Sequence, residues 1–350
     1  MANATNNSSS TLTDGVLKFS LVIYCVIFVV GLLGNGLVIY VTGFRMKKTV
    51  NSVWFLNLAL ADFLFTAFLI FSIISTSQNH QWPFGRFMCK LNSFVSLVNM
   101  FASVFLLMAI SLDRCLSIWV VVWAQNKRTV RKAQLITAVV WVTAVVCSAP
   151  AATFRETLTF KDKTYCTYPF TTPLQTLNTF RFVLGFLLPF LVIFVSYVAI
   201  AVRAGRLQRT RRQRCRRMIF SVIVAFFLCW LPFHIMTFIN VENSNIIRMA
   251  GSVSLSLAYL NSCMNPILYV FMCDEFQKKL KQSICFVLES ALAEDHLSFM
   301  SSRSLSSHLS RFSRKSESGS PSEKMSSATP MNFTGSKVVV TEVKEILSTD

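Results

Sequence analysis

The sequence is poor in charged residues, and acidic ones are especially few. Only 14% of its 350 residues are Asp, Glu, Lys or Arg, whereas 53% are hydrophobic. Because a typical soluble protein carries about 25% charged residues, a soluble globular domain is disfavoured. Acidic residues number 16 against 34 basic ones, for a formal net charge of +18. Such an excess could attract nucleic acid, so the position of the basic residues along the chain is decisive.

The usual signs of an enzyme are also missing. The sequence has no Walker phosphate-binding loop and no Gly-x-Ser-x-Gly motif, and its four histidines have no metal-ligand spacing. The stretch Gly31–Gly36 is not a dinucleotide fingerprint, because it lies inside an apolar run where small residues let helices approach closely. These absences argue against catalysis and against an organic cofactor.

What the sequence does contain is long apolar stretches with few charges. There are seven, near residues 17–44, 52–76, 90–112, 133–153, 180–202, 218–240 and 247–272. Each is about long enough to cross a bilayer as a helix. We therefore predict an all-α integral membrane protein with a seven-transmembrane helix bundle over residues 17–273.

The basic residues are concentrated beside these spans. They are Arg45, Lys47 and Lys48 after the first span, Lys127, Arg128, Arg131 and Lys132 after the third, and eight arginines from Arg203 to Arg217 after the fifth. By the positive-inside rule, the N-terminus is extracellular and the chain is a multi-pass protein of the plasma membrane. The positive charge therefore lies in the cytoplasmic segments beside the spans, and no nucleic-acid partner is expected.

The N-terminal tail, residues 1–16, suits an extracellular position. Asn3, Asn6 and Asn7 each begin an Asn-x-Ser/Thr pattern and are candidate glycosylation sites. No basic segment precedes a short apolar run, so we expect the first span, rather than a cleaved signal peptide, to direct insertion.

The predicted positions of the ten cysteines relative to the membrane indicate which of them can form a disulfide. Only Cys89, at the outer end of the third span, and Cys166, between the fourth and fifth, face an oxidising compartment, so we predict a disulfide between them. Cys285 is a candidate palmitoylation site, with an unmodified thiol as the alternative.

The C-terminal part divides into two segments. Residues 274–288 carry apolar side chains at helical spacing with lysines between them, which predicts an amphipathic helix on the membrane surface. Residues 289–350 are rich in serine and are predicted to be a disordered cytoplasmic tail. Receptor kinases and arrestin are the expected partners of these serines; a solvated spacer is the alternative.

Polar residues inside the spans suggest a buried site. Asp62 in the second span is a carboxylate among apolar neighbours, which is costly unless it is paired, protonated or bound to a cation. Asn99 and Ser103 lie one turn apart on the third span, and so do Asn261 and Asn265 on the seventh. If these faces converge, they form a polar pocket able to hold a monovalent cation such as sodium, and Pro266 provides a hinge beside it.

At the inner end of the third span, Asp113 is adjacent to Arg114. An ordinary interfacial pair is one interpretation. A conformational switch is the interpretation we prefer, because it agrees with the rest of the sequence.

Several motifs together resemble the rhodopsin-like G-protein-coupled receptors. They are Asn35, "LALAD" in the second span, the cysteine pair, Asp113–Arg114, Trp141, Pro189, "FFLCWLPF" and "NPILY". Five segments are similar, more specifically, to the formyl peptide receptors of the chemoattractant group: "GNGLVIYVTGFRMKKTV", "WPFGRFMCK", "SLDRC", "VWAQNKRTV" and "LESALAEDH". The rodent members of that receptor family include chemosensory receptors of the vomeronasal organ. The resemblance covers residues of about 17 to 285.

This resemblance implies a role for each matching residue. The residues that match the family's sodium pocket are Asp62, Asn99, Ser103, Asn261 and Asn265. Trp230 matches the toggle residue below the ligand, with Val104, Pro189 and Phe226 as a packing triad. Arg114, Tyr197 and Tyr269 match residues that rearrange when a heterotrimeric G protein enters, and the implied G protein is of the inhibitory class.

The sequence departs from the formyl peptide receptors at the ligand site. Their acidic residue on the third span falls on Leu97, and of their two arginines on the fifth span only the inner one is kept, as Arg181, while the outer falls on Leu177. Around Arg181 we expect an apolar floor of Leu97, Met100, Phe101, Phe233 and Tyr259, with His234 as a polar contact. This predicts a hydrophobic peptide ligand with little dependence on a formyl group, unless Arg181 instead points outward to the membrane surface. The proline expected seven residues after Arg114 is Val121.

Two other function classes are considered. A receptor for a non-formylated or non-peptide ligand that signals mainly through arrestin is the alternative. A transporter or channel is less favoured, because the sequence shows no internal repeat and few intramembrane charges.

Overall fold

The computed structural model describes the backbone of residues 2–204, 228–239 and 245–272, together with positions 221, 225 and 282. Side chains are described from Gly15 onward within these ranges, except at 123, 204, 245, 248 and 267–272. The described residues all belong to one compact unit, residues 1–288. Several predictions fall outside the described residues: the amphipathic segment 274–288, Cys285, the tail 289–350, Phe226, and the side chains of Asn3, Asn6, Asn7 and Tyr269.

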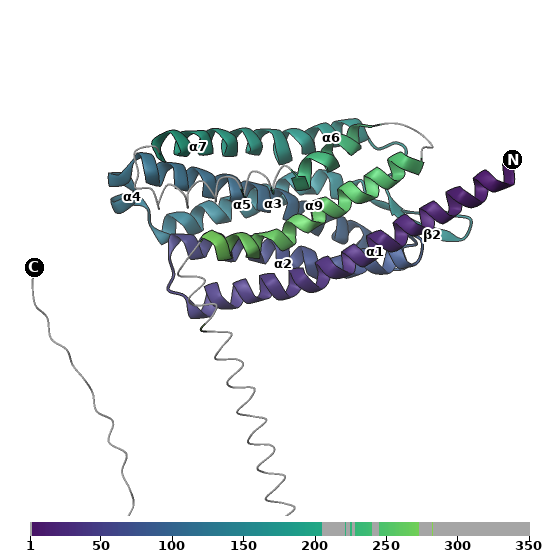
Figure 1. Ribbon diagram of the computed structural model, residues 1–350, viewed down its shortest axis with the longest axis horizontal. Helices are drawn as coiled ribbons and strands as arrows, with labels where there is room; N and C mark the ends of the chain where they lie inside the picture. Colours follow the sequence, from purple (N-terminus) through teal and green to yellow (C-terminus); the bar gives the residue numbers. More distant parts are fainter. Residues whose placement is uncertain are drawn as a thin grey trace, which may run out of the picture. The chain divides into compact units, whose positions relative to one another are not determined.

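The unit is a bundle of long helices with one short β-hairpin. Its elements are α1 (Ala2–Tyr40), α2 (Val50–Ser77), α3 (Gly85–Trp119), α4 (Val121–Lys127), α5 (Val130–Thr153), β1 (Glu156–Phe160), β2 (Lys163–Thr167), α6 (Leu174–Phe182), α7 (Leu188–Ala204), a helix over Leu228–Phe238, and α9 (Asn245–Met272). π-helical turns follow α1 at Val41–Arg45 and join α6 to α7 at Val183–Leu187. In Figure 1 the long helices run alongside one another, with α4 at one end of the bundle and the β-hairpin at the other.

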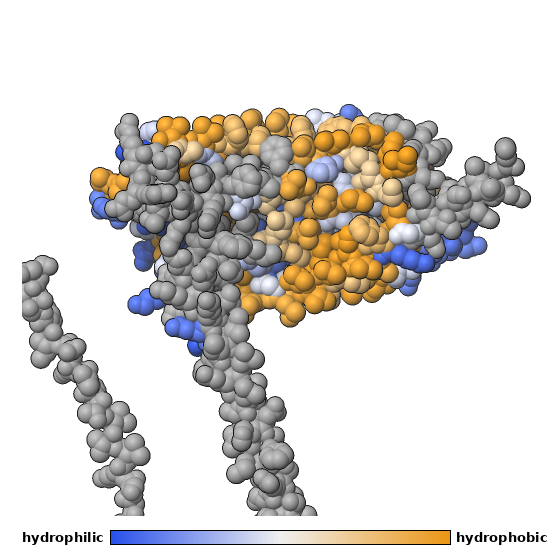
Figure 2. Space-filling view, viewed as in Figure 1, coloured by the Kyte–Doolittle hydropathy of each residue, from blue (hydrophilic) through white to orange (hydrophobic). Residues whose placement is uncertain are grey.

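Five of the predicted spans are confirmed as helices long and apolar enough to cross a membrane. They are Gly15–Arg45, Val50–Ser77, Gly85–Trp119, Val130–Thr153 and Leu174–Arg203. The sixth predicted span is described in part, as Leu228–Phe238, and the seventh forms α9. Figure 2 shows apolar residues along the flanks of the bundle and polar ones gathered at its two ends, the distribution expected of a protein in a bilayer.

Local sequence sets where two of the spans begin. Thr49 precedes α2 and forms a capping box with Ser52: each side-chain oxygen accepts a hydrogen bond from the other's backbone N–H, over 3.1 and 2.8 Å. Thr129 caps α5 in the same position by accepting from the backbone N–H of Lys132. These caps satisfy backbone donors that would otherwise lack partners at the helix start.

Polar side chains join the helices inside the bundle. The Asn35 amide donates to the carbonyl oxygens of Gly31, at 2.9 Å, and of Ser262 on α9, at 3.0 Å. The Trp141 indole on α5 donates to the Asn57 side chain on α2 over 3.0 Å. Because the surrounding lipid offers no alternative partners, such bonds fix which helix faces meet.

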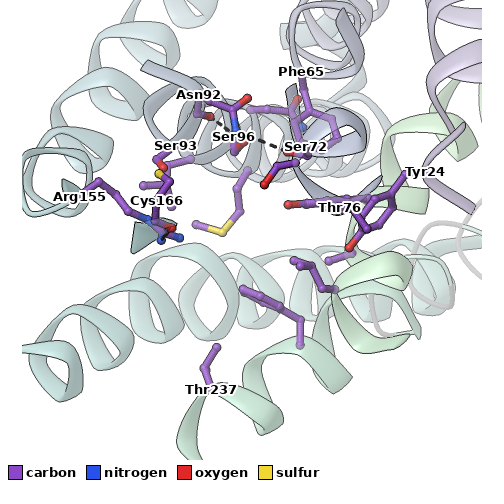
Figure 3. Close-up of a pocket in the computed structure, with 18 of the residues that line it drawn as sticks. Tyr24, Phe65, Ser72, Thr76, Asn92, Ser93, Ser96, Arg155, Cys166 and Thr237 are labelled. Atoms are coloured by element: carbon purple, nitrogen blue, oxygen red, sulfur yellow. Dashed lines mark hydrogen bonds between the residues drawn. The ribbon is translucent and has the colours of Figure 1, made fainter. Parts of the chain in front are cut away.

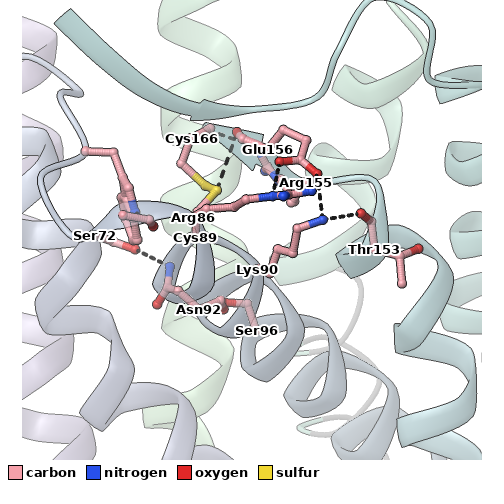
Figure 4. The surroundings of a disulfide bond; sticks show 12 residues. Ser72, Arg86, Cys89, Lys90, Asn92, Ser96, Thr153, Arg155, Glu156 and Cys166 are labelled. Carbon is pink, nitrogen blue, oxygen red and sulfur yellow. Dashed lines mark hydrogen bonds and ion pairs between the residues drawn. A yellow bond between two sulfur atoms is a disulfide. The ribbon is translucent and has the colours of Figure 1, made fainter. Parts of the chain in front are cut away.

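The predicted disulfide joins Cys89 at the start of α3 to Cys166 on β2, and it ties the hairpin to the bundle (Figure 4). Beside it, the carboxylate of Glu156 on β1 accepts from Arg86 at 2.6 Å and Lys90 at 2.8 Å. These hydrogen bonds lower the pKa of the Glu156 carboxyl group from its ordinary value to about 2. The hairpin is therefore held to α3 by one covalent bond and two ion pairs.

Candidate functional site

A cavity of about 420 Å³ lies near the hairpin end of the bundle. Its lining comes from α1, α2, α3, α6, α9, the helix Leu228–Phe238 and the segments around the hairpin. In Figure 3, Arg155 and Cys166 stand at one side of this cavity and Tyr24 and Thr76 at the other. The cavity thus reaches across the bundle, at the end where the disulfide lies.

Five of the eight predicted ligand-site residues line the cavity. These are Leu97, Met100, Arg181, Phe233 and Tyr259. Arg181 lines it from α6, so it points inward rather than snorkelling to the membrane surface. Trp230, the predicted toggle, is buried and also forms part of the lining.

The other three predicted ligand residues do not line the cavity. Phe101 follows Met100 and is therefore turned by about 100° around α3, where it packs against Phe105 and Phe180. Leu177 is buried one turn before Arg181. These side chains are therefore not part of the cavity lining, and their contact with a ligand stays a prediction.

His234 is also buried away from the cavity, at 1% exposure. Its ring lies among the aromatic rings of Phe182, Phe186, Trp230 and Phe233, at centroid distances of 5.2 to 6.2 Å. Neither ring nitrogen has a hydrogen-bond partner among the described residues. His234 therefore packs behind the cavity wall, and its polar contact with a ligand stays a prediction.

One cationic lining residue was missed by the sequence interpretation. Arg155 follows α5 and precedes β1, and it lines the cavity together with Arg181. Its Nη1 donates to the Cys166 carbonyl over 3.1 Å, and its Cζ lies 4.2 Å from the centre of the Tyr168 ring. Among the described lining residues there is no Asp or Glu, so this end of the cavity is positively charged.

Away from the two arginines, one part of the lining is uncharged but polar. It consists of short side chains from α2 and α3: Ser72, Ser75, Thr76, Asn92, Ser93 and Ser96. The Asn92 amide donates to the Ser72 hydroxyl over 3.5 Å, a weak hydrogen bond (Figure 3). These groups could donate or accept hydrogen bonds to a ligand backbone without selecting a charge.

A second polar site lies deeper in the bundle, around Asp62. Its Oδ2 accepts from the Asn265 amide at 2.6 Å and its Oδ1 from the Ser103 hydroxyl at 3.3 Å. Ser103 is also 3.2 Å from the Asn99 side-chain oxygen, and the Asn99 amide donates to the Ser262 hydroxyl at 3.1 Å. The predicted convergence of polar faces from the second, third and seventh spans is therefore present.

The network differs from the prediction at one position on α9. Ser262, which was not predicted, joins it, whereas Asn261 is buried without a hydrogen bond to it among the described residues. The side-chain oxygens of Asp62, Asn99, Ser103 and Ser262 are the hard ligands that a sodium ion prefers. A monovalent cation therefore fits this donor set, although the Asn265 amide now occupies one Asp62 oxygen.

At the opposite end of the bundle from the hairpin, Asp113 has a partner that was not predicted. Both of its carboxylate oxygens accept from Arg128, each at 2.8 Å, and Arg128 also donates to Asn51 on α2 at 2.7 Å. Of the predicted switch residues, Arg114 is half-buried on α3 and Tyr197 is buried on α7.

Three further predicted switch residues occupy the interior or bend a helix. Val104 on α3 is fully buried, and Pro189 lies at the start of α7. Pro266 lies inside α9, directly after Asn265. Their positions suit the packing and hinge roles predicted for them.

Residues 34–269 match the model of the 7 transmembrane receptor (rhodopsin family). The match covers more than half of the chain and includes the Asp62 network and all of the cavity lining except Tyr24. The chain belongs to the rhodopsin family of seven-transmembrane receptors. The receptor is therefore a multi-pass membrane protein of a family that signals through G proteins, and it is not an enzyme.

Several curated relatives are chemoattractant receptors. The receptor is 38% identical to a chemerin-like receptor 1 of Sus scrofa, over 82% of this chain and 86% of the relative. It is 39% identical to formyl peptide receptor 2 of Mus musculus, over 82% and 88%. It is 41% identical to a C3a anaphylatoxin chemotactic receptor of Danio rerio, over 84% and 82%. The resemblance to formyl peptide receptors is confirmed, and the chemerin-like and C3a receptors are similar to the same degree.

Proposed function

We propose that this protein is a chemoattractant receptor of the cell surface whose ligand is an extracellular peptide with an apolar end and a free carboxylate. The observation that carries this proposal is the positive end of the cavity, where Arg155 and Arg181 have no Asp or Glu beside them among the described lining residues. A guanidinium group can bind a carboxylate through two parallel hydrogen bonds. Leu97, Met100 and Phe233 would cover the apolar side chains that precede this carboxylate.

The proposed ligand has no need of a formyl group. Leu97 stands in the lining where the formyl peptide receptors have an acidic residue, so that polar contact is lost. Leu177, at the position of their second arginine, is buried outside the cavity, and Arg155 supplies a second cation from a different element. The charge pattern thus favours the acidic end of a peptide over a formylated amino end.

The proposed output is activation of a heterotrimeric G protein of the inhibitory class, through outward movement of the sixth span. Trp230 lines the cavity and lies on that span, so a ligand that contacts it can prefer one position of the helix. A ligand shifts such an equilibrium only through its different affinities for the two states. Receptor kinases and arrestin are proposed to act on the serine-rich tail, and sodium is proposed to bind at Asp62 in the resting state.

The test uses purified receptor in lipid nanodiscs with an inhibitory G protein, and it measures nucleotide exchange. The probes are pooled synthetic octapeptides with apolar final residues, prepared as free acids, as C-terminal carboxamides and with an N-formyl group. We expect the free acids to be about ten- to a hundredfold more potent than the carboxamides, because one or two charge-assisted hydrogen bonds are lost. The formyl group should make little difference.

Arg181→Gln should remove the preference for the free acid. Arg86→Gln is the matched control, because Arg86 binds Glu156 outside the cavity and should leave this preference unchanged. Equal potency of the free acids and carboxamides on the wild-type receptor would exclude the proposed ligand class. Exchange that requires the formyl group would exclude it as well.

A further inference from the structure

A titratable side chain lines the cavity at the end away from the arginines. His80 follows α2 in the loop that leads to α3, and it forms part of the lining. The backbone N–H of His80 donates to the Ser75 carbonyl oxygen over 2.8 Å, and that of Asn79 donates to the Thr76 carbonyl oxygen over 3.2 Å. His80 therefore belongs to the side of the cavity where Thr76 stands, opposite Arg155 (Figure 3).

The loop holds His80 in a strained backbone conformation. The φ angle is +55° at Asn79 and +63° at His80, in the left-handed region that residues other than glycine seldom adopt. Such a conformation costs free energy and persists only where the surroundings enforce it. The loop is also fixed beyond His80, because the buried Trp82 donates from its backbone to the Thr164 carbonyl over 2.7 Å and from its indole to the Gly85 carbonyl over 3.0 Å. The imidazole is therefore held at the cavity before a ligand binds.

The imidazole of His80 has no partner within the part of the chain that the structure describes. It forms no hydrogen bond or ion pair with another described residue, and neither do the hydroxyls of Ser75 and Thr76, which line the cavity beside it. Since the described lining contains no Asp or Glu, an acceptor for these donors must come from the ligand.

The other charged and titratable groups around this end of the cavity keep their charge near neutral pH. Those that share the lining with His80 are Arg155, Arg181, Tyr24, Tyr168 and Tyr259. Those on the described parts of α1, α3 and the hairpin are Lys18, Arg86, Lys90, Glu156, Lys163 and Tyr165. Between about pH 5.5 and 7.5 the basic groups stay charged, the tyrosines stay neutral and Glu156 stays ionised. Of the described groups at this end, His80 is therefore the one that titrates in this range.

We propose that His80, with Ser75 and Thr76, forms a second subsite that binds an acidic side chain of the ligand while the imidazole is protonated. This inference rests on the proposed function for the presence of a peptide ligand. It adds the chemistry of a second contact, an Asp or Glu that precedes the apolar carboxyl end. His80 is thus a specificity-determining residue that makes the receptor bind acidic peptides more tightly in acidic surroundings.

The direction of the pH dependence follows from the position of His80. Partial burial lowers the pKa of its imidazole in the empty receptor, which favours the neutral form at about pH 7.5. A ligand carboxylate beside the imidazole favours the charged form and raises this pKa, so binding takes up a proton. The affinity for an acidic peptide should therefore rise as the pH falls from about 7.5 to about 5.5.

The experiment measures binding of octapeptide pools to purified receptor in lipid nanodiscs at these two pH values. The pools have apolar final residues and acetylated amino ends, and a single Glu, or Gln in its place, is moved through the earlier positions. Each pool is prepared as the free acid and as the C-terminal carboxamide. At about pH 5.5 we expect Glu at its best position to bind about three- to tenfold more tightly than Gln, and at about pH 7.5 the two should agree within about twofold.

Two variants test whether the imidazole itself is responsible. His80→Asn should remove the preference for Glu at about pH 5.5, because asparagine tolerates a positive φ but cannot become charged. Gln81→Asn is the matched control, since Gln81 is the next residue and lies outside the cavity lining, and it should keep the wild-type preference.

The outcomes separate this inference from the proposed function. Absence of the Glu preference at about pH 5.5 would overturn the inference, and so would a preference that is independent of pH or survives His80→Asn. Loss of the preference in Gln81→Asn as well would assign the effect to the loop backbone and overturn it too. Equal binding of free acids and carboxamides would instead exclude the proposed ligand class, and the carboxamide pools would still test His80. Failure of every pool to bind would overturn both.

Discussion

The Asn265 amide donates to the Asp62 carboxylate over 2.6 Å, a short bond that joins α9 to α2 in the middle of the bundle. Both side chains are almost fully buried, at 1% and 0% exposure. Each would be unfavourable there alone, because lipid and packed side chains offer few partners. Together with Ser103 they form a network that satisfies the polar groups next to the Pro266 position.

We predict that sodium favours the resting receptor through Asp62. In wild type, replacing choline chloride by sodium chloride at constant ionic strength should weaken agonist binding by about fivefold or more, since the ion binds the resting state better. Asp62→Asn removes the charge that attracts the cation, so its agonist affinity should be independent of this exchange. Radioligand or fluorescence binding with the free-acid octapeptides measures both. The same sodium dependence in wild type and Asp62→Asn would exclude the site.

Much of this network could be predicted from the sequence, because amides and carboxylates are rare in membrane spans. Asp62, Asn99 and Asn265 stand out against apolar neighbours, and a spacing of four residues places Ser103 on the same helix face as Asn99. Ser262 gave no such signal, since serine is common in spans. Helix periodicity alone cannot show which of Asn261 and Ser262 faces the network, because this depends on the rotation of α9 against its neighbours.

The ligand cavity was harder to predict for a related reason. Met100 and Phe101 are both apolar and adjacent, and only the rotation of α3 decides that Met100 lines the cavity while Phe101 packs behind it. Arg155 lies just before the hairpin, and its direction depends on the disulfide and the hairpin pairing. Contacts between segments far apart in sequence, such as Arg128 with Asn51, leave no local pattern at all.

The disulfide should be required for a stable receptor. Cys166→Ser should remove most of the protein from the cell surface, because losing a bridge of this kind typically costs about 2–5 kcal/mol. Cys147→Ser is the control, since Cys147 is a free, half-buried cysteine of α5. Surface labelling of an N-terminal epitope measures both variants. Wild-type surface levels and ligand response in Cys166→Ser would show that the bridge is dispensable.

The ion pairs beside the disulfide predict a particular pH dependence. The pKa of Glu156 is lowered to about 2 in the folded receptor, so its contribution to stability is complete above its ordinary pKa. That contribution is lost as the pH falls from about 4.5 toward about 2. The difference in unfolding temperature between wild type and Glu156→Gln should thus be constant from about pH 5 to 8 and shrink below. A difference that varies across the neutral range would contradict this assignment.

Arg128 should control how strongly Asp113 attracts Arg114. With both carboxylate oxygens bound by Arg128, Asp113 has little capacity for its sequence neighbour. Arg128→Ala frees the carboxylate to hold Arg114, so agonist-stimulated nucleotide exchange should fall by about two- to tenfold. The double variant Arg128→Ala with Asp113→Asn should regain exchange, because the competing charge is gone. No recovery in the double variant would show that Arg128 acts by another route.

Close packing of α1 on α2 gives a prediction about stability. A Cβ at Gly31 would collide with the Thr66 methyl group, and Thr66 cannot easily turn away because its hydroxyl donates to the carbonyls of Asp62 and Phe63. Gly31→Ala should therefore destabilise the receptor by about 1–3 kcal/mol, seen as an unfolding temperature lower by several degrees.

Thr66→Ser deletes the methyl group and keeps the hydroxyl, so the double variant should recover most of the loss. Gly36→Ala, whose Cβ would lie an ordinary 3.6 Å from Phe63, is the control and should change little. Equal losses for Gly31→Ala with and without Thr66→Ser would show that the collision is not the cause.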